Sequence, residues 1–227
     1  SDALTAAEVG FVELVPAFDG IAVVVNPQNG WADCLTVEQL ARIWRPDDPA
    51  ERWSDVDPQW PDEPIQLYGP GADSGTFEYF TEVIVGEAKS CRSDFSASED
   101  DNVLVTGVSN DKHALGYFGF AYYDENREKL KVLSIREGDG QCVAPEVETI
   151  RNNTYRPLSR PLYLYVRHSL LARPEGSDFV RFYLDQSATL ATEVGYVPVS
   201  SDMRRRNDER LEAALLTAGA DEAEASI

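Results

Sequence analysis

A turn of small polar residues in this chain has the composition of an anion-binding site. Asp73, Ser74, Gly75 and Thr76 precede a run with helical periodicity in the stretch LYGPGADSGTFEYFTEVI, residues 67–84. The first N–H groups of a helix have no partner inside the helix, and the helix dipole places partial positive charge there. Gly75 lets the main chain approach a ligand closely, while the two hydroxyls can donate hydrogen bonds to acceptor oxygens. A strand, a glycine-containing turn and a helix N-terminus therefore compose an oxyanion pocket.

Two interpretations of this turn stay open on the residues alone. A carboxylate at Asp73 can accept a proton, so the site would bind a protonated oxyanion and reject a fully deprotonated one. Ordinary capping of the following helix explains the same residues, and it is the commoner use of Ser-Gly-Thr at such a position. The turn lacks the Gly-Lys-Ser/Thr of a Walker A loop and the Gly-x-Ser-x-Gly of a nucleophile elbow.

The elements expected around the turn alternate between strands and helices. Expected strands lie at 11–27 (two strands with a crossing point between them), 65–69, 130–135 and 160–166, and the stretch 114–126 is expected to contain a strand followed by a helical turn. Expected helices lie at 36–44, 76–86, 97–111, 174–187 and 201–217, with a helix end at 1–9 and irregular loops at 45–63 and 136–158. This alternation predicts an α/β fold with a mainly parallel sheet.

Local signals set several of the predicted helix boundaries. Thr36 is placed to cap the first helix, Gly86 to end the helix after the turn, and Pro174 to open a later one. Ser98, with Asp101 three residues later, predicts an N-cap for the helix at 97–111.

Charge and composition exclude several classes of partner. The 227 residues carry 20 basic and 40 acidic side chains, a net charge of −20, which opposes binding to nucleic acid or to anionic membranes. No apolar run approaches the ~20 residues needed to cross a bilayer, so direct membrane insertion is not expected. No secretory signal opens the sequence, so any export signal has been removed or was never present.

Cysteine and histidine spacing argues against a metal site. The three cysteines, Cys34, Cys91 and Cys142, form no CxxC motif, and the histidines His113 and His168 stand far apart. Outside the cytosol, one pair of cysteines would close a disulfide and leave the third over. We therefore expect no metal and no cofactor.

Six stretches, taken in order, resemble one known family. They are PAFDGIAVVVNPQNGWADCLTVEQLARIW, GPGADSGTFEYFTE, SASEDDNVLVTGV, ALGYFGFAYY, PLSRPLYLYV and EVGYVPV. Together they resemble the phosphate-binding receptors of ABC-type phosphate importers, which have the type II periplasmic-binding-protein fold. The resemblance runs from about residue 10 to residue 200 and is specific because all six motifs agree in order.

The resemblance implies two α/β lobes with mixed, mainly parallel sheets, joined by two crossing hinge strands near 15–21 and 158–163. The second lobe, residues 18–160, would be complete. Residues 1–17 and 161–217 would supply only the remainder of the first lobe, because the family's opening segment is not in this sequence, and residues 218–227 would be a disordered tail.

The resemblance also assigns site residues. Ser74, Gly75 and Thr76 match the family's anion loop, and Asp73 matches its acidic variant. Some relatives place an arginine four positions before the serine, where this chain has Pro70. The remaining cleft candidates are Arg92, which is otherwise a surface arginine, and Asp100, Asp101 and Asn102, which otherwise cap a helix. Cys34 and Cys142 are implied to be bonded, leaving Cys91 free or paired with a cysteine of the absent segment.

The implied function is that of an extracytoplasmic solute-binding protein, not an enzyme. It would bind inorganic phosphate between its lobes and deliver it to the membrane subunits of an ABC-type permease. The implied location is periplasmic or extracytoplasmic, including anchoring to the cell surface through the absent N-terminus. A phosphoesterase and a non-transporting phosphate sensor or surface protein are the alternatives. The enzyme needs a metal cluster or an activated nucleophile, and neither is evident in the sequence.

Overall fold

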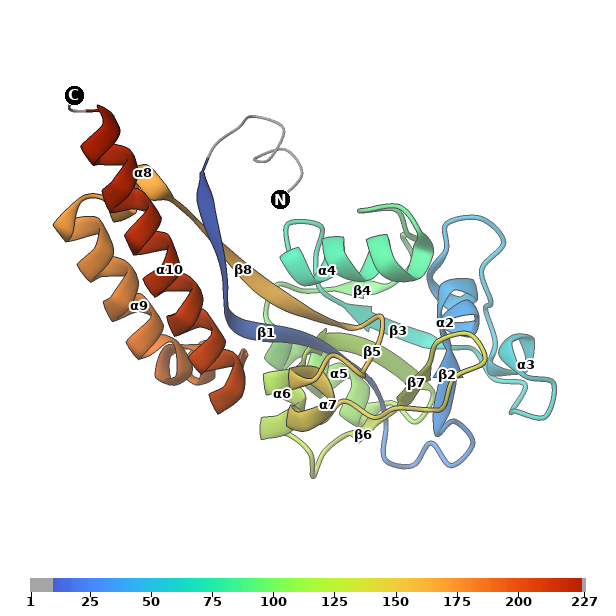
Figure 1. Cartoon of the computed structure of the whole chain (residues 1–227). Coiled ribbons are helices and arrows are strands. Elements are labelled where there is room, and N and C mark those ends of the chain that lie inside the picture. The colour runs from blue at the N-terminus through green and yellow to red at the C-terminus, as the bar shows by residue number, and fades with distance from the viewer. Residues whose placement is uncertain (1–9, 226–227) are drawn as a thin grey trace. The chain divides into compact units, whose positions relative to one another are not determined.

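The structure is a computed structural model that describes residues 10–225, so the helix end expected at 1–9 lies outside the described residues. The strands are β1 (Phe11–Val25), β2 (Cys34–Thr36), β3 (Gln66–Gly69), β4 (Ser96–Ala97), β5 (Ala114–Gly119), β6 (Lys131–Val132), β7 (Ser134–Arg136), β8 (Ser159–Arg167) and β9 (Val197–Pro198). The helices are α2 (Val37–Trp44), α3 (Trp53–Val56), α4 (Gly75–Phe80), the π-helical turn η1 (Thr81–Val85), α5 (Asp101–Asn110), α6 (Phe120–Glu125), α7 (Val147–Arg151), α8 (His168–Leu171), α9 (Pro174–Glu193) and α10 (Ser201–Ala225) (Figure 1).

The chain divides into two compact units, which we describe separately. Unit 1 comprises residues 1–18 and 161–227, and unit 2 comprises residues 19–160. The chain therefore passes between the units twice, once within β1 and once within β8. Among the described residues, no helix is long and apolar enough to span a membrane.

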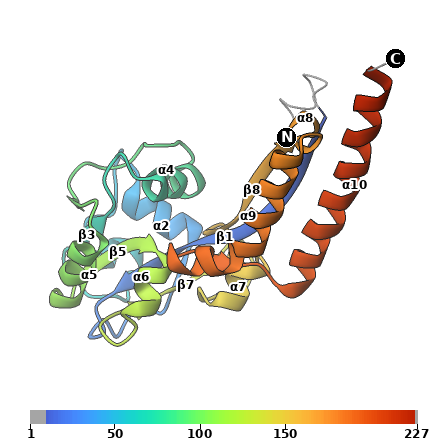
Figure 2. The ribbon, with the colours of Figure 1, turned by 90° about the vertical axis from the view of Figure 1, so that its left-hand side faces the viewer.

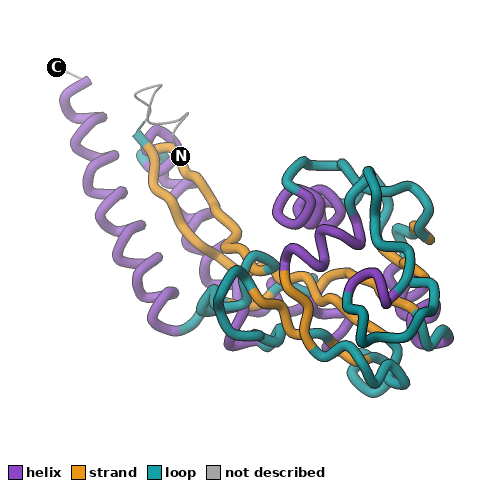
Figure 3. Tube along the Cα trace, turned by 90° about the vertical axis from the view of Figure 1, so that its right-hand side faces the viewer, coloured by secondary structure: helices purple, strands orange, loops and turns teal. Residues whose placement is uncertain are grey.

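Unit 2 is built on a mixed sheet, and the α/β class is confirmed. Its strand order is β4-β3-β5-β1-β6, with β3 parallel to both β4 and β5 and with β1 antiparallel to β5 and β6. A separate parallel pair joins β2 to β7. The segment Ile21–Val25 of β1 is fully buried, as is typical of a strand covered on both faces and rich in β-branched residues. Figure 3 shows these strands enclosed by helices and loops.

Helices cover both faces of the unit 2 sheet. On one face, the ring of Tyr117 lies 4.9 Å from that of Trp44 in α2 and 3.7 Å from that of Phe80 in α4, measured between centroids. On the other face, a Cβ on Gly116 would come within 2.8 Å of the Val108 side chain in α5. Strand β5 is therefore packed against helices on both of its faces.

The predicted cysteine pairing is confirmed. Cys34 and Cys142 form a disulfide, with their Cα atoms 6.1 Å apart, and Cys91 is free. The bond joins the start of β2 to the segment that follows β7, so it closes the β2–β7 pair of unit 2 covalently.

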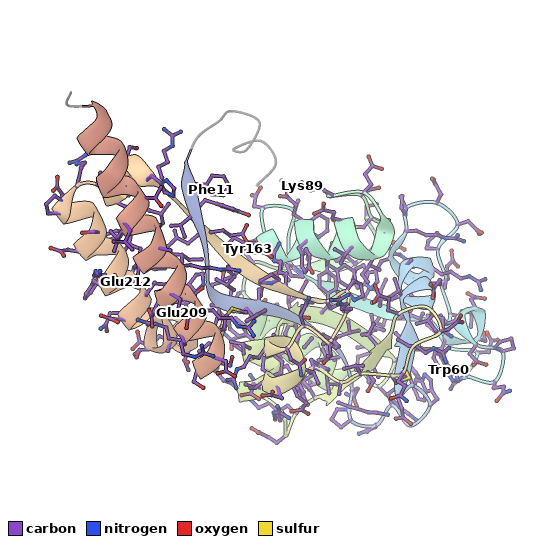
Figure 4. All side chains as sticks on the ribbon, viewed as in Figure 1. Phe11, Trp60, Lys89, Tyr163, Glu209 and Glu212 are labelled. Carbon is purple, nitrogen blue, oxygen red and sulfur yellow. A yellow bond between two sulfur atoms is a disulfide. The ribbon has the colours of Figure 1, made fainter. Side chains whose placement is uncertain are left out.

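Unit 1 consists of the outer parts of β1 and β8 with α8, α9, β9 and α10. Its core includes Val12 and Leu14 from β1, Val166 from β8, Val180 from α9 and Leu211 from α10. Figures 1 and 2 show α9 and α10 side by side, and an ion pair between Arg181 and Glu212 joins them. Phe11 and Tyr163 point to the side of the ribbon away from α10 (Figure 4).

The structure corrects two predicted strands. The expected pair at 11–27 is one continuous strand, β1, because the backbone stays extended through Pro16 and Gly20. The expected strand at 130–135 is two strands, β6 and β7, because β6 pairs with β1 whereas β7 pairs with β2.

Helices also extend further than predicted. The loops expected at 45–63 and 136–158 contain the short helices α3 and α7. Helix α10 continues through residues 218–225, in the segment where a disordered tail is expected. Alanine and glutamate favour helix strongly, so a polar composition did not exclude it.

Candidate functional site

The candidate site lies where the parallel strands of unit 2 end. Gly69 of β3 pairs with Ala97 of β4, and the N–H of Ser98 donates to the Gly69 carbonyl at 3.2 Å. The strand β5 runs parallel on the other side of β3. Each of the three strands leads into a helix: β3 and β4 through a turn into α4 and α5, and β5 directly into α6. The carboxyl ends of parallel strands in α/β sheets are where ligands bind, because helix N-termini meet there.

Ser74 caps α4. Its Oγ accepts hydrogen bonds from the N–H groups of Thr76 at 3.1 Å and Phe77 at 3.5 Å. Its own N–H donates to the Gly71 carbonyl at 3.1 Å. The capping interpretation of Ser-Gly-Thr is therefore present in the structure. A hydroxyl that accepts two bonds still has its hydrogen to donate, so capping does not remove Ser74 as a ligand donor.

The Gly75 amide is the donor that remains for a ligand. Among the residues that the structure describes, no acceptor is recorded for its N–H, and a Cβ built on Gly75 would have no neighbour within 4 Å. Asp73 and Gly75 are exposed and Ser74 and Thr76 are partly exposed. The turn thus presents one free amide and two hydroxyls on an open surface.

The start of α5 is capped by Asp100. Its Oδ1 accepts from the N–H of Asn102 at 2.9 Å and from Asn102 Nδ2 at 3.0 Å. The predicted N-cap, Ser98, is wrong, because its hydroxyl instead accepts from the Asp100 N–H at 3.0 Å and closes the turn before the helix. The capping alternative for Asp100 and Asn102 is the one that the geometry shows.

Carboxylates crowd the two turns. A Cβ on Gly71, in the turn before α4, would overlap the Glu99 carboxylate, so the turns after β3 and β4 lie against each other. Burial, with the charges of Asp100 and Glu99 nearby, raises the pKa of Asp101 to about 6. A carboxyl group in this range can accept a proton from a ligand or donate one near neutral pH.

Arg92 does not face this site. It is 8% exposed, and its guanidinium donates to both Asp94 oxygens at 2.6 Å and to the carbonyls of Ile43 and Ala50. The hydrogen bonds to Asp94 raise the pKa of Arg92 above the usual value for arginine. Arg92 is therefore a buried cation that holds its own part of unit 2 together. The sequence suggested a cleft ligand or a surface arginine, and the structure shows neither.

A residue beside α4 that the sequence did not single out is Arg160. Its Cζ lies 4.0 Å from the centroid of the Tyr79 ring in α4, and its Nε and Nη2 donate to Asp19 Oδ2 at 3.2 and 3.1 Å. Tyr79 also donates its hydroxyl hydrogen to the carbonyls of Pro157, at 2.6 Å, or Ser159, at 3.3 Å. The partners Asp19 and Arg160 are separated by 141 positions in the chain, so no local pattern connects them.

A small tetrahedral anion matches this arrangement chemically. Neutral N–H and O–H donors on α4 can bond its oxygens, and carboxylates nearby can accept its protons. A guanidinium close to the helix adds positive charge without requiring net positive charge of the whole molecule.

A family model described as the PBP superfamily domain matches residues 1–187. The chain belongs to the PBP superfamily. Protein SphX of Synechocystis sp. is 49% identical over 198 residues, which are 86% of this chain and 59% of that protein. The phosphate-binding protein PstS of Staphylococcus saprophyticus is 35% identical over 184 residues, 80% of this chain and 55% of that protein. The chain thus spans less than two thirds of the length of these relatives.

Solved structures agree with membership of the PBP superfamily. The crystal structure of a possible phosphate binding protein from Planctomyces limnophilus is 46% identical, with a TM-score of 0.89, and the match covers 94% of this chain and 76% of that chain. An ABC-type phosphate transport receptor from Vibrio cholerae has the same fold, with a TM-score of 0.65 at 24% identity.

Proposed function

We propose that the protein carrying this chain is an extracytoplasmic solute-binding protein that binds inorganic phosphate and passes it to the membrane subunits of an ABC-type permease. The observation that carries the proposal is the turn before α4, where the Gly75 N–H and the Ser74 and Thr76 hydroxyls are available to an anion. Relatives named phosphate-binding protein PstS support the choice of phosphate. No bond is made or broken in this role.

Binding would rest on neutral donors and helix ends. Desolvating a phosphate is costly unless each oxygen finds a hydrogen bond, and charge-assisted bonds from N–H groups are among the strongest in proteins. Asp73 at the edge of the turn would accept the proton of hydrogen phosphate, an interaction that sulfate, which carries no proton at neutral pH, cannot make. We therefore propose that phosphate is preferred over sulfate.

A single substitution can remove the N–H donor of Gly75 while changing little else in the turn. Gly75 is the first residue of α4, where proline is well accepted because that N–H has no helical partner, and Ser74 before it has the extended backbone that a following proline requires. Gly75→Pro removes the donor, whereas Gly75→Ala keeps it and adds a methyl group into open space. We expect Gly75→Pro in the full-length protein to bind phosphate at least about tenfold more weakly than Gly75→Ala, because a bond to a charged group is worth about 1.5–3 kcal/mol.

Calorimetric titration with phosphate, and with sulfate as the competing anion, measures these affinities. Equal affinities of the proline and alanine variants would show that the Gly75 amide is not a ligand. If the wild-type protein binds sulfate and not phosphate, the substrate assignment is wrong. Thermal melting of each variant checks that α4 has formed.

A further inference from the structure

The cluster of Asp19, Tyr79 and Arg160 has features that its contribution to folding does not explain. The Asp19 side chain is 13% exposed and that of Arg160 is 36% exposed, so the carboxylate is largely, and the guanidinium partly, removed from water. Withdrawing two charges from solvent costs several kcal/mol for each ion, and apolar residues in such positions are often equally or more stabilising. A half-buried ion pair beside a candidate binding turn is therefore a candidate for function.

The geometry holds the guanidinium in one orientation. Asp19 Oδ2 accepts from Nε and Nη2, and the Tyr79 ring lies beneath the guanidinium plane. Among the described residues, no acceptor is recorded for Nη1 of Arg160. Burial raises the pKa of Tyr79 to about 12, so its hydroxyl stays protonated. That hydroxyl donates to the carbonyl of Pro157 or Ser159, which holds the ring in place.

Tyr79 places this cation next to the turn before α4. Residues four apart on a helix share a face with Cβ atoms about 5–6 Å apart, so Tyr79 lies one turn below Gly75. Long side chains on a helix lean toward its N-terminus, which brings the Tyr79 ring, and Arg160 above it, toward the free amide. The residue that some relatives use as a cation in this loop is Pro70 here, so the loop itself supplies no positive charge.

We propose that Arg160 is the cation that balances the charge of the anion bound at the turn before α4, and that Asp19 and Tyr79 hold it in position. The inference rests on the proposed phosphate-binding function and adds a positioning residue to that site. Arg160 acts through its charge, at a distance from the donors of the turn, and its partner Asp19 keeps it directed toward α4. Burial raises the pKa of Asp19, and the nearby charge of Arg160 lowers it less. A carboxylate held in so unfavourable a position is consistent with a role in orienting Arg160.

The test compares phosphate affinities in the full-length protein. Arg160→Gln removes the charge, Arg160→Lys keeps it, and Arg156→Gln removes an exposed arginine of the same segment as a matched control. We expect Arg160→Gln to weaken phosphate binding about tenfold or more, Arg156→Gln to change it less than twofold, and Arg160→Lys to recover most of the loss. Recovery by lysine distinguishes a charge effect from a structural one, because lysine cannot reproduce the bidentate and stacked contacts of arginine.

The double variant Asp19→Asn/Arg160→Gln guards against misfolding. It removes both charges, so no carboxylate is left buried without a partner and the net charge of the protein is unchanged. We expect this variant to melt close to the wild type and to bind phosphate as weakly as Arg160→Gln. Wild-type affinity in the double variant would overturn the inference. A wild-type protein that binds no phosphate would instead refute the proposed function, so the two failures are distinguishable.

Discussion

At the scale of single residues, the turn before α4 combines capping with a surface for a ligand. Ser74 accepts two backbone N–H groups, which leaves its hydrogen free to point outward, and Gly75 follows with an amide that nothing in the described structure accepts. Neither residue carries charge. From the crossing strands, the guanidinium of Arg160 lies over the Tyr79 ring of α4. Neutral donors with a guanidinium beside the same helix are chemically suited to a small anion.

Asp101 is expected to make stability depend on pH. Its pKa of about 6 in the folded state exceeds the ordinary value of 3.8, so between these pH values the folded state binds more protons than the unfolded state. Stability from this group is then present at low pH and is lost as pH rises through 6. The full difference corresponds to about 3 kcal/mol, which we discount to about 1 kcal/mol because the side chain is half-buried.

The variant Asp101→Asn isolates this effect because asparagine does not titrate. Between pH 4 and pH 7, urea unfolding should show the variant gaining about 1 kcal/mol relative to the wild type. Asp139→Asn, at an exposed position, controls for the change in net charge. A difference between Asp101→Asn and wild type that stays constant with pH would contradict the prediction.

Residue-level roles were predictable from sequence only where partners are close in the chain. Thr36 forms the predicted cap of α2, and the Ser74 turn opens α4, because both signals act within three residues. The burial of Arg92 and the pairing of Arg160 with Asp19 depend on contacts 42 to 141 positions apart. Such contacts leave no local pattern, so the cation of the site could not be identified from the sequence.

At the scale of elements, α4 and η1 show how one predicted helix becomes two conformations. The helix was expected to run from the turn to Gly86, and the stop is correct, since Gly86 has φ +94°. The last turn is π-helical, and buried Thr81 donates its hydroxyl to the carbonyl of Phe77, at 2.9 Å, or Glu78, at 3.0 Å, and accepts the Lys89 N–H at 2.7 Å. The spacing of apolar residues does not show where a side-chain hydroxyl will bond to helix carbonyls, so it could not predict the π-helical turn.

Gly86 is expected to be required for its backbone conformation alone. A Cβ there would meet no atom within 4 Å, so Gly86→Ala should cost about 1–2 kcal/mol of unfolding free energy through left-handed strain. Gly86→Asn should cost less, because asparagine tolerates this region better. Urea denaturation of both variants measures this. Equal stability of the alanine variant would mean that the end of the helix rearranges without cost.

The disulfide is expected to be the largest single contribution to the stability of unit 2. It joins residues separated by 108 positions, and crosslinks that close long loops restrict the unfolded chain most. The double variant Cys34→Ala/Cys142→Ala should lose about 2–4 kcal/mol in chemical denaturation. Cys91→Ser, which changes the free thiol, should lose less than about 1 kcal/mol. Comparable losses in both variants would show that the crosslink itself is not responsible.

At the scale of the whole molecule, the α/β class and the order of most elements followed from the sequence, whereas the pairing of strands did not. Alternating strands and helices indicate the class, but only the fold shows that β1 runs antiparallel to β5 while β3 lies parallel between β4 and β5. Pairing partners are set by contacts between distant segments. The resemblance to a family implied the two lobes and the crossing strands, but not which strands pair.

The net charge of −20 is expected to oppose the approach of phosphate even if the local site attracts it. Charge repulsion in solution reaches only about one Debye length, which falls from about 30 Å at 0.01 M salt to about 8 Å at 0.15 M. The donors of the turn and Arg160 act at shorter range, so added salt should weaken the repulsion more than the binding.

The association rate constant of phosphate with the full-length protein should therefore rise as ionic strength increases over this range, opposite to the behaviour of a protein that steers its ligand electrostatically. Stopped-flow measurement at 0.01 and 0.15 M ionic strength, with a non-coordinating anion, tests this. A rate constant that falls with salt would mean that the positive potential near Arg160 extends into solvent and outweighs the acidic surface. In that case the Arg160→Gln variant should reverse the sign of the salt dependence, whereas Arg156→Gln should not.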